Sequence, residues 1–210
     1  MQDRWDKLAA RLSEEALVIL GHCRLPEESP QSGTLALIGP DEPRFWPWFT
    51  QSPEYRAKGP DPMDRWSKRV LTTIASELAA EALFPSDGPP YHPFFSWAVR
   101  TGRFWPSPIG FLVHDTRGLF ASFRGALVLP GAAPDLSATQ PCLTCDAPCK
   151  TACPVDAFAD GYDVAACKAH LRSPAGADCM SLGCRARRAC PVGQANRLPA
   201  QAAFHMEAFL

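Results

Sequence analysis

The chain has no long apolar run and no excess of charge of either sign. No uninterrupted hydrophobic stretch approaches the roughly 20 residues that span a bilayer, so no membrane partner is expected. The formal net charge of −1 excludes a broad electrostatic attraction to nucleic acid or to an anionic membrane. The sequence begins with acidic residues and no apolar signal-peptide core, which predicts a cytoplasmic location where thiols stay reduced.

Cysteine is nearly absent from the first two thirds of the chain. Residues 1–141 contain only Cys23, whereas residues 142–190 contain the other eight of the nine cysteines. Small and helix-breaking residues fill residues 131–141 and predict a linker. We therefore expect an α+β domain over residues 1–137, followed by a small cysteine-bearing domain with a short C-terminal tail over residues 138–210.

Three segments of the first domain predict helices. Apolar side chains recur at helical spacing in residues 3–20. Asp61 followed by proline is typical of a helix start and predicts a helix over residues 62–83. A shorter helix is predicted over residues 93–102.

The predicted strands of this domain are short. Residues 34–38 form an apolar run that ends before glycine and proline, which indicates a buried strand. Residues 109–114 and 119–123 are rich in β-forming residues and flank a four-residue turn, which predicts a hairpin. Residues 124–129 are expected to extend its second strand.

The first four cysteines follow a spacing used by iron–sulfur proteins. They read Cys142-Leu-Thr-Cys145-Asp-Ala-Pro-Cys149-Lys-Thr-Ala-Cys153-Pro154. Bacterial two-cluster ferredoxins have the run CxxCxxCxxxCP, in which the fourth cysteine binds the other cluster. Here the second interval has one extra residue. Eight cysteines are the number that two [4Fe-4S] clusters require.

The crossed arrangement of the ferredoxins predicts which cysteines share a cluster. The first predicted ligand set is Cys142, Cys145, Cys149 and Cys190. The second is Cys153, Cys167, Cys179 and Cys184.

Two other uses of these cysteines remain as alternatives. Structural zinc sites commonly have two separated CxxC pairs, whereas only Cys142 and Cys145 form one here. Disulfides are expected mainly in small secreted proteins. Cys23 stands apart and is interpreted as an ordinary half-buried thiol. Arg185, Arg187 and Arg188 form the one compact basic patch; we interpret it as balancing the charge of an anionic cluster, so a nucleic-acid partner is not favoured.

The cysteine region resembles the two-cluster module of epoxyqueuosine reductases and reductive dehalogenases. The resemblance rests on the first cysteine run, on Asp163-Val-Ala-Ala-Cys167-Lys-Ala-His170-Leu, on Gly183-Cys184 and on Ala189-Cys190-Pro191. Those enzymes use the clusters to reduce a bound cobalamin.

The preceding region resembles cobalamin-binding domains. Residues 109–131 look like the hairpin and following strand of those enzymes, and more closely like the CblC-type cobalamin-processing chaperones, which also have a Pro-Asp-Leu like Pro134-Asp135-Leu136. Residues 34–38 and Asp61-Pro-Met-Asp64 resemble chaperone segments in the same order. The resemblance covers roughly residues 34–190. It implies a nitroreductase-like cobalamin-binding domain followed by a ferredoxin-like two-cluster module.

This resemblance implies an oxidoreductase that holds cobalamin and transfers electrons to it from two [4Fe-4S] clusters, reducing it or removing its upper ligand. A redox donor protein or a small reductant would supply the electrons. A corrin pocket needs apolar walls and polar donors at its rim. Aromatic residues are also common core residues, and histidines are often structural. The candidates for contact with the corrin are Trp97, Trp105, Phe111, His114, Phe120, Phe123 and Arg124.

Two departures from the reductases limit the expected activity. The helical-repeat tail with which epoxyqueuosine reductases grip transfer RNA does not follow the cysteine region, so a transfer RNA substrate is not expected. Asp87 lies near the place of their proton-donating aspartate, but its neighbours differ, and a loop aspartate beside glycine and proline often forms a turn. The alternatives are a cobalamin-dependent reductase of another substrate, such as a modified nucleoside, and a ferredoxin-type electron carrier without corrin.

Overall fold

The chain folds into two compact units. The computed structural model describes residues 2–25, 33–134, 137–194 and 198–210. Unit 1 comprises Met1–Arg103 and Ser122–Ala138, and unit 2 comprises Phe104–Ala121 and Thr139–Leu210. The segment Phe104–Ala121 therefore belongs with the cysteine-bearing part of the chain, whereas the sequence had placed it in the first domain.

Unit 1 is built on a four-stranded antiparallel sheet with the order β1-β2-β6-β3. In the central pairing Leu37 lies opposite Ala126. Every residue of β2 and β6 is buried, as expected for strands covered on both faces. The strands are β1 (Leu17–Arg24), β2 (Thr34–Pro40), β3 (Glu81–Leu83) and β6 (Gly125–Leu129).

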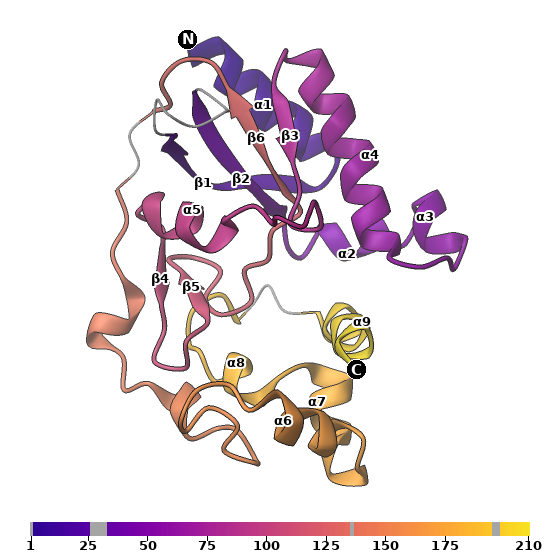
Figure 1. Cartoon of the computed structure of the whole chain (residues 1–210), viewed down its shortest axis with the longest axis vertical. Coiled ribbons are helices and arrows are strands. Elements are labelled where there is room, and N and C mark those ends of the chain that lie inside the picture. Colours follow the sequence, from indigo (N-terminus) through magenta and orange to yellow (C-terminus); the bar gives the residue numbers. More distant parts are fainter. Residues whose placement is uncertain (1, 26–32, 135–136, 195–197) are drawn as a thin grey trace. The chain divides into compact units, whose positions relative to one another are not determined.

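The helices of unit 1 bury an aromatic core. Helices α1 and α4 lie side by side along the sheet, with α1 against β1 and α4 against β3 and β6 (Figure 1). The rings of Phe45, Phe49 and Trp66 lie within 5.8 Å of one another. The helices are α1 (Gln2–Glu14), α2 (Phe45–Phe49), α3 (Pro53–Arg56), α4 (Pro62–Glu77) and α5 (Phe94–Arg100).

Two predicted helices are shorter than their sequence pattern suggested. The helix predicted over residues 3–20 ends at Glu14, because Ala16 has a positive φ of 52° and the chain then enters β1. Its last apolar residues fit a strand equally well, and pairing with β2 decides for the strand. The helix predicted over residues 62–83 ends at Glu77, where β3 follows. The strand at residues 34–38 and the helix that begins at Pro62 are confirmed.

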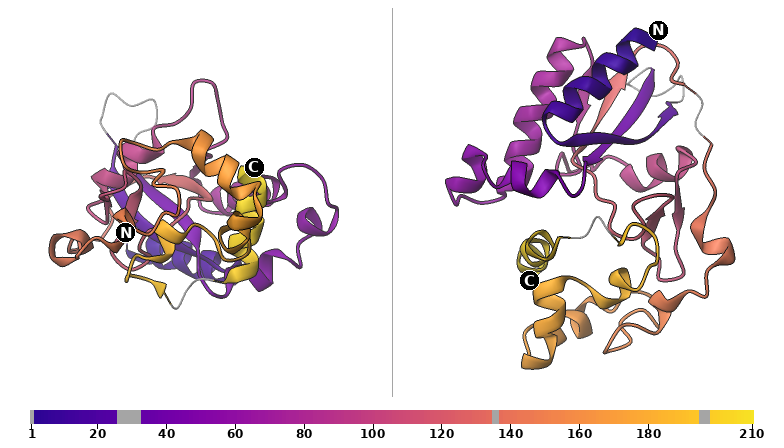
Figure 2. Two further views of the ribbon diagram at one scale, coloured as in Figure 1. Left: turned by 90° about the horizontal axis from the view of Figure 1, so that it is seen from below. Right: turned by 180° about the vertical axis from the view of Figure 1, so that it is seen from behind.

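Unit 2 contains one small two-stranded sheet and several short helices. Strand β4 (Phe104–Pro106) pairs with β5 (Leu112–His114), so that Phe104 lies opposite His114. Helix α9 packs against α7 (Figure 2). The helices are α6 (Val164–Leu171), α7 (Ala177–Leu182), α8 (Arg185–Arg188) and α9 (Pro199–Phe209), with short 3-10 turns η1 (Pro141–Thr144), η2 (Pro148–Lys150) and η3 (Pro174–Gly176).

The predicted hairpin at residues 109–123 is wrong in its pairing. Strand β5 pairs with β4, and only His114 and Gly118 form a bridge across the predicted turn. Residues 119–123 form no strand, and the buried Leu119 side chain packs into the core of unit 2. The predicted extension at residues 124–129 pairs with β2 and β3 in the other sheet.

The described helices include none that is long and apolar enough to cross a membrane. The mixed α+β class expected from the sequence is confirmed.

Candidate functional site

Four cysteines of unit 2 line one cavity. They are Cys142, Cys145, Cys149 and Cys190, and the space that they line is small. We call this space the cysteine cavity. The four residues are those that the ferredoxin spacing grouped together, although Cys190 is distant in sequence from the other three. Its other walls are Ser107, Pro108, Val113, Leu119, Ala147, Pro148 and Pro191.

Two short turns place the first three cysteines. Pro141 opens η1, and the backbone N–H of Cys145 donates to the oxygen of Cys142 at 3.4 Å. The interval with one extra residue passes through Ala147, whose φ of 53° is left-handed, before Pro148 opens η2. This bend lets the chain reverse, so that Cys149 faces the same cavity as Cys142.

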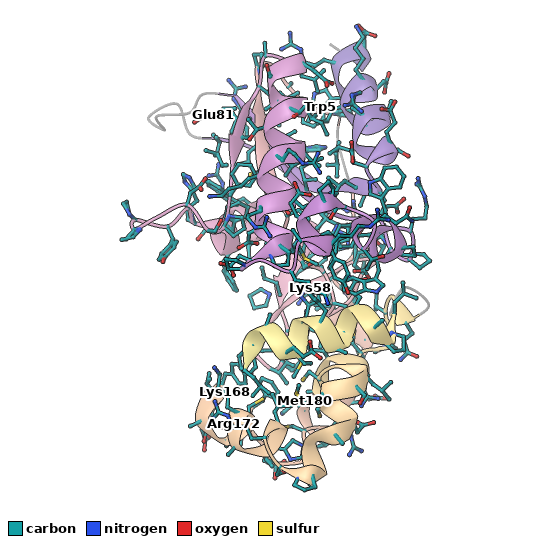
Figure 3. The ribbon with its side chains drawn as sticks, turned by 90° about the vertical axis from the view of Figure 1, so that its right-hand side faces the viewer. Trp5, Lys58, Glu81, Lys168, Arg172 and Met180 are labelled. Atoms are coloured by element: carbon teal, nitrogen blue, oxygen red, sulfur yellow. The ribbon has the colours of Figure 1, made fainter. Side chains whose placement is uncertain are left out.

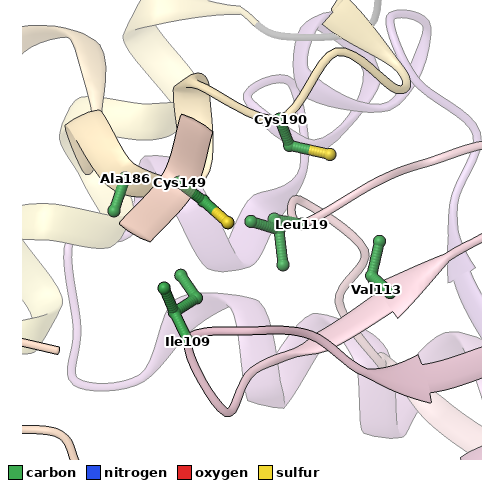
Figure 4. Close-up of a cluster of buried hydrophobic side chains, with 6 residues drawn as sticks. All are labelled: Ile109, Val113, Leu119, Cys149, Ala186 and Cys190. Atoms are coloured by element: carbon green, nitrogen blue, oxygen red, sulfur yellow. The ribbon is translucent and has the colours of Figure 1, made fainter. Parts of the chain in front are cut away.

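The cysteine cavity lies within the hydrophobic core of unit 2. Cys149 and Cys190 are 6% and 7% exposed. They pack in one cluster with Ile109, Val113, Leu119 and Ala186 (Figure 4). Burial raises the pKa of the Cys142 and Cys149 thiols, and each is raised further by the other cysteines of the cavity. Thiols that oppose one another's ionisation in this way are suited to a cationic ligand.

Ser107, one of the residues that line this cavity, has an unsatisfied hydroxyl. The residue is 8% exposed, and its Oγ atom is buried without a hydrogen-bond partner in the described part of the chain. An unpaired buried hydroxyl costs about 1–3 kcal/mol. A group with acceptor atoms inside the cysteine cavity would remove that cost.

A turn of the chain closes over Cys190. Gly118 has a φ of 57°, and a β-carbon added to it would lie 3.1 Å from the Cys190 Sγ atom. Gly193 approaches the same turn, since its added β-carbon would lie 2.9 Å from the backbone of Arg117. The two glycines permit the backbones to meet at this point.

The other four cysteines form the second cysteine group: Cys153, Cys167, Cys179 and Cys184. Burial raises the pKa of Cys179 and Cys184, and hydrogen bonds from backbone N–H groups at the start of α8 oppose the increase. Cys153 Sγ accepts the N–H of Ala157 at 3.4 Å.

Tyr162 contacts the second cysteine group. Its hydroxyl donates to Cys167 Sγ at 3.4 Å. Burial and this hydrogen bond raise the pKa of Tyr162, and the electrostatic influence of Cys184 raises it further. Cys167 and Cys184 thus lie around one phenol.

The basic residues beside these cysteines make contacts within unit 2. Arg187 Nε donates to the oxygen of Leu119 at 2.7 Å, and its guanidinium lies 4.8 Å from the centre of the Phe120 ring. Arg188 pairs with Asp178 and donates from Nε to the oxygen of Gly183 at 3.0 Å. Arg187 lowers the pKa of Cys184, in opposition to burial. These contacts favour the interpretation that the patch balances charge near the cysteines.

The seven predicted corrin contacts are divided between the two units. Trp97, Phe123 and Arg124 belong to unit 1, and Trp105, Phe111, His114 and Phe120 belong to unit 2. In unit 1 the Phe94 ring lies between Trp97 and Phe123, at 5.2 and 5.8 Å. In unit 2 Trp105 and Phe111 pack against the core that holds Cys149 and Cys190.

Arg124 carries an unsatisfied polar atom in unit 1. Its Nε atom is buried and has no hydrogen-bond partner among the described residues. Burial lowers the pKa of the guanidinium, while Asp64 and Glu42 act in the opposite direction. A buried donor without an acceptor is costly, and a ligand with amide or phosphate oxygens would supply one.

His114 and Asp87 are engaged locally. His114 is 1% exposed, and its Nδ1 atom accepts the N–H groups of Thr116 and Arg117 at 3.2 Å. That nitrogen therefore faces the turn that follows it. Asp87 Oδ2 accepts the N–H of Phe84 at 3.1 Å, and Oδ1 pairs with Lys68 at 2.8 Å. These are the contacts of a turn-forming carboxylate.

Cys23 lies in β1. It is buried, and its thiol donates to the oxygen of Trp97 at 3.8 Å. Burial raises its pKa. It remains an ordinary thiol in unit 1, more buried than expected.

Single-ion geometry is absent from the described residues: no three His, Cys, Asp or Glu side chains converge as ligands of one metal ion. Zinc needs sulfur ligands about 2.3 Å from its centre. In a cubane each cysteine binds a different iron atom, so the sulfurs stand farther apart around a larger object.

The fold has a match among solved structures. It is similar to that of a B12-trafficking protein. The crystal structure of the C. elegans B12-trafficking protein CblC, a human MMACHC homologue, aligns with a TM-score of 0.51 and 15% sequence identity, covering 100% of this chain and 96% of that chain. No protein-family model and no curated protein matches the sequence. At this identity the similarity establishes the fold alone.

Sequence reasoning missed Ser107, Gly118 and Tyr162. Gly118 had a usable signal, because a glycine in a predicted turn often marks a close approach. Ser107 and Tyr162 had none, since their roles depend on which cysteines the fold brings to them. The predicted Pro134-Asp135-Leu136 similarity falls partly on residues outside the described ones.

Proposed function

We propose that this chain is an iron–sulfur oxidoreductase that binds cobalamin and delivers electrons to it from two [4Fe-4S] clusters, reducing the corrinoid or removing its upper ligand. The observation that carries the proposal is the cysteine cavity, where four of the predicted ligands meet. A redox protein or a small reductant is the proposed source of electrons.

The residues around the cysteine cavity fit a cluster. The four thiols are the ligand number of one cubane. The Ser107 hydroxyl is buried and has no partner among the residues that the structure describes, and the inorganic sulfides of a cluster accept hydrogen bonds. The apolar wall from Ile109, Val113 and Leu119 excludes water, which is one of the factors that set a cluster's potential.

The second cysteine group fits a cluster through its hydrogen bonds. Cys153, Cys167, Cys179 and Cys184 each have a donor directed to sulfur. Such donors stabilise thiolates. The arginines of α8 add positive charge where the four thiolates and the cluster are negative. These residues therefore favour the ligated, ionised state of the second cysteine group.

Two observations support cobalamin as the proposed ligand: the similarity of the fold and an unsatisfied polar atom in unit 1. The similar C. elegans protein is described as B12-trafficking. Arg124 of unit 1, next to Phe123, has a buried Nε atom without a partner in the described ranges, and corrin carries amides at the rim of an apolar ring. Bound cobalamin would supply a low-potential cobalt centre, while the chain's own part is to bind the ring, exclude water and position the electron supply.

Spectroscopy of the reconstituted protein tests the corrin part of the proposal. The chain is loaded anaerobically with iron and sulfide, cobalamin is added, and visible spectra are recorded with and without a strong reductant. A shift to a base-off spectrum supports the proposal. Unchanged spectra at saturating protein would leave a ferredoxin-type electron carrier without corrin.

Two variants locate the corrin site. Arg124→Gln should weaken the spectral shift, because its buried donor is replaced by a shorter group. Arg44→Gln is the control, since Arg44 is an exposed arginine of unit 1 paired with Asp41. Equal binding by both variants would remove Arg124 from the proposed site. Binding without reduction or loss of the upper ligand would point to an enzyme that acts on another substrate, such as a modified nucleoside.

A further inference from the structure

A helix start brings Tyr162 to Cys167. Asp163 is the N-cap of α6, and its side chain accepts the N–H of Ala166 at 2.8 Å. Tyr162 is therefore the residue before the cap, and Cys167 is the fourth residue of the helix. These two positions contact each other at many helix starts. Here the contact is a hydrogen bond from the phenol to Sγ, at 3.4 Å.

Three other rings fix the direction of this phenol. The Tyr162 ring stacks on Phe158 at 4.9 Å, meets Phe111 edge-on at 5.3 Å and stacks on Phe209 at 6.3 Å. All of these contacts are made by the ring and none by the hydroxyl. A phenylalanine at position 162 would therefore keep the packing and lose only the hydrogen bond to sulfur.

The outer ring of this stack is anchored as well. The Lys168 ammonium lies 5.0 Å from the centre of the Phe209 ring. Lys168 on α6 and Arg172, the residue after its end, donate to the oxygen of Leu210 at 3.4 and 3.5 Å (Figure 3). The end of α9 is thus tied to the helix that carries Cys167, and the phenol cannot turn away without breaking several contacts.

We propose that Tyr162 is a positioning residue for the cluster held by Cys167, and that its hydroxyl makes the reduction potential of that cluster more positive than it would otherwise be. This inference rests on the proposed function, because it takes Cys167 as a ligand. Hydrogen bonds to ligand sulfurs are among the factors that set cluster potentials. A donor withdraws negative charge from sulfur, and the reduced cluster carries one more electron, so the bond stabilises the reduced form more than the oxidised form.

The Tyr162 hydroxyl bonds to a predicted ligand of the second cluster, not to one of the first cluster. Its hydrogen bond goes to Cys167, and the cysteine cavity has Ser107 as its own hydroxyl. Removing the Tyr162 hydroxyl should therefore shift one of the two potentials.

The test is a redox titration of the reconstituted protein followed by electron paramagnetic resonance. Tyr162→Phe should shift one midpoint potential to a more negative value, leave the other unchanged and keep the iron content of the parent protein. Tyr55→Phe is the matched control, because Tyr55 packs against Trp46 and Phe49 in unit 1. It should shift neither potential.

A second variant separates the hydrogen bond from packing. Phe158→Leu removes one face of the stack but keeps the hydroxyl, so we expect a smaller shift of the same potential in the same direction. Full iron content with both potentials unchanged in Tyr162→Phe would overturn the inference and leave the proposed function standing. A parent protein that takes up no iron would overturn both.

Discussion

Gly118 and Cys190 are in contact across 72 residues of sequence, and the contact leaves no room for a side chain. A β-carbon on Gly118 would lie 3.1 Å from the Cys190 Sγ atom and would collide with the backbone oxygen of Val192. The segment before the linker thus helps to shape the cysteine cavity. This explains why Phe104–Ala121 belongs to unit 2 despite its distance in sequence from the cysteines.

Gly118→Ala should displace Cys190 and reduce the iron held by the first ligand set. The positive φ alone costs about 1–2 kcal/mol for a residue with a β-carbon, and the collision adds to that. Gly110→Ala is the control, because Gly110 has a φ of 79° but its added β-carbon would have no atom of the described residues within 4 Å. Iron analysis and thermal unfolding should show a larger loss for Gly118→Ala; equal losses would mean that backbone strain alone acts.

Ser107→Ala should have opposite effects on the empty and the loaded protein. Without iron, removing an unsatisfied buried hydroxyl should stabilise the chain by about 1 kcal/mol. With clusters, the same change removes a donor to the first cluster, so the gain should vanish or reverse. Anaerobic denaturation of both forms measures this.

Ser67→Ala is the comparison for Ser107→Ala, since Ser67 is buried but donates to the oxygen of Met63 at 2.7 Å. It should give no gain in either form. A gain of the same size for Ser107→Ala with and without iron would show that nothing in the cysteine cavity accepts its hydrogen bond.

Cys149→Ala and Cys153→Ala should damage different clusters although the two residues are close in sequence. Cys149 lies in the cysteine cavity, and Cys153 belongs to the second cysteine group. Each variant should lose about half of the iron, with a different signal missing from the electron paramagnetic resonance spectrum. Cys23→Ala, in unit 1, should lose none. Loss of both signals in both variants would contradict the crossed assignment.

Glu54→Gln should destabilise unit 1 at neutral pH and have no effect in acid. Arg69 donates to both carboxylate oxygens of Glu54, at 2.6 and 3.1 Å, and lowers the pKa of Glu54 from 4.5. A lowered pKa contributes stability above the unfolded value that is lost as the pH falls through the folded value. We expect a difference of about 1 kcal/mol at pH 7.

Denaturant unfolding across pH measures this difference, which should disappear as the pH falls below 4.5. The exposed pair of Asp3 with Lys7 gives the control Asp3→Asn, which should change the unfolding midpoint little. A Glu54→Gln effect that persists in acid would mean that packing rather than the ion pair is lost.

Local signals in the sequence were enough for several elements of the fold. The apolar run at residues 34–38 and the proline after Asp61 each specify one structure, and β2 and α4 begin where expected. Residues 16–20 are apolar at positions that suit both helix and strand. Only pairing with β2 resolves them as β1, and that partner is distant in sequence.

The candidate site, like the fold, could be predicted from the sequence only in part. Cysteine spacing predicted that Cys142, Cys145 and Cys149 share a ligand set with the distant Cys190. These four line one cavity, and the ligand set stays a prediction. Spacing contains no information on second contacts such as the Ser107 hydroxyl or the Tyr162 phenol. These depend on tertiary proximity, as does the placement of Phe111 and Phe120 in unit 2 among the cysteines.

The central claim is that the eight cysteines hold two iron–sulfur clusters. The most direct measurement is the iron, sulfide and zinc content of the protein after anaerobic reconstitution and gel filtration. We predict roughly eight iron atoms and eight sulfides per chain, four of each for every cubane. A protein that retains zinc and no sulfide, or that emerges free of metal, would contradict the account.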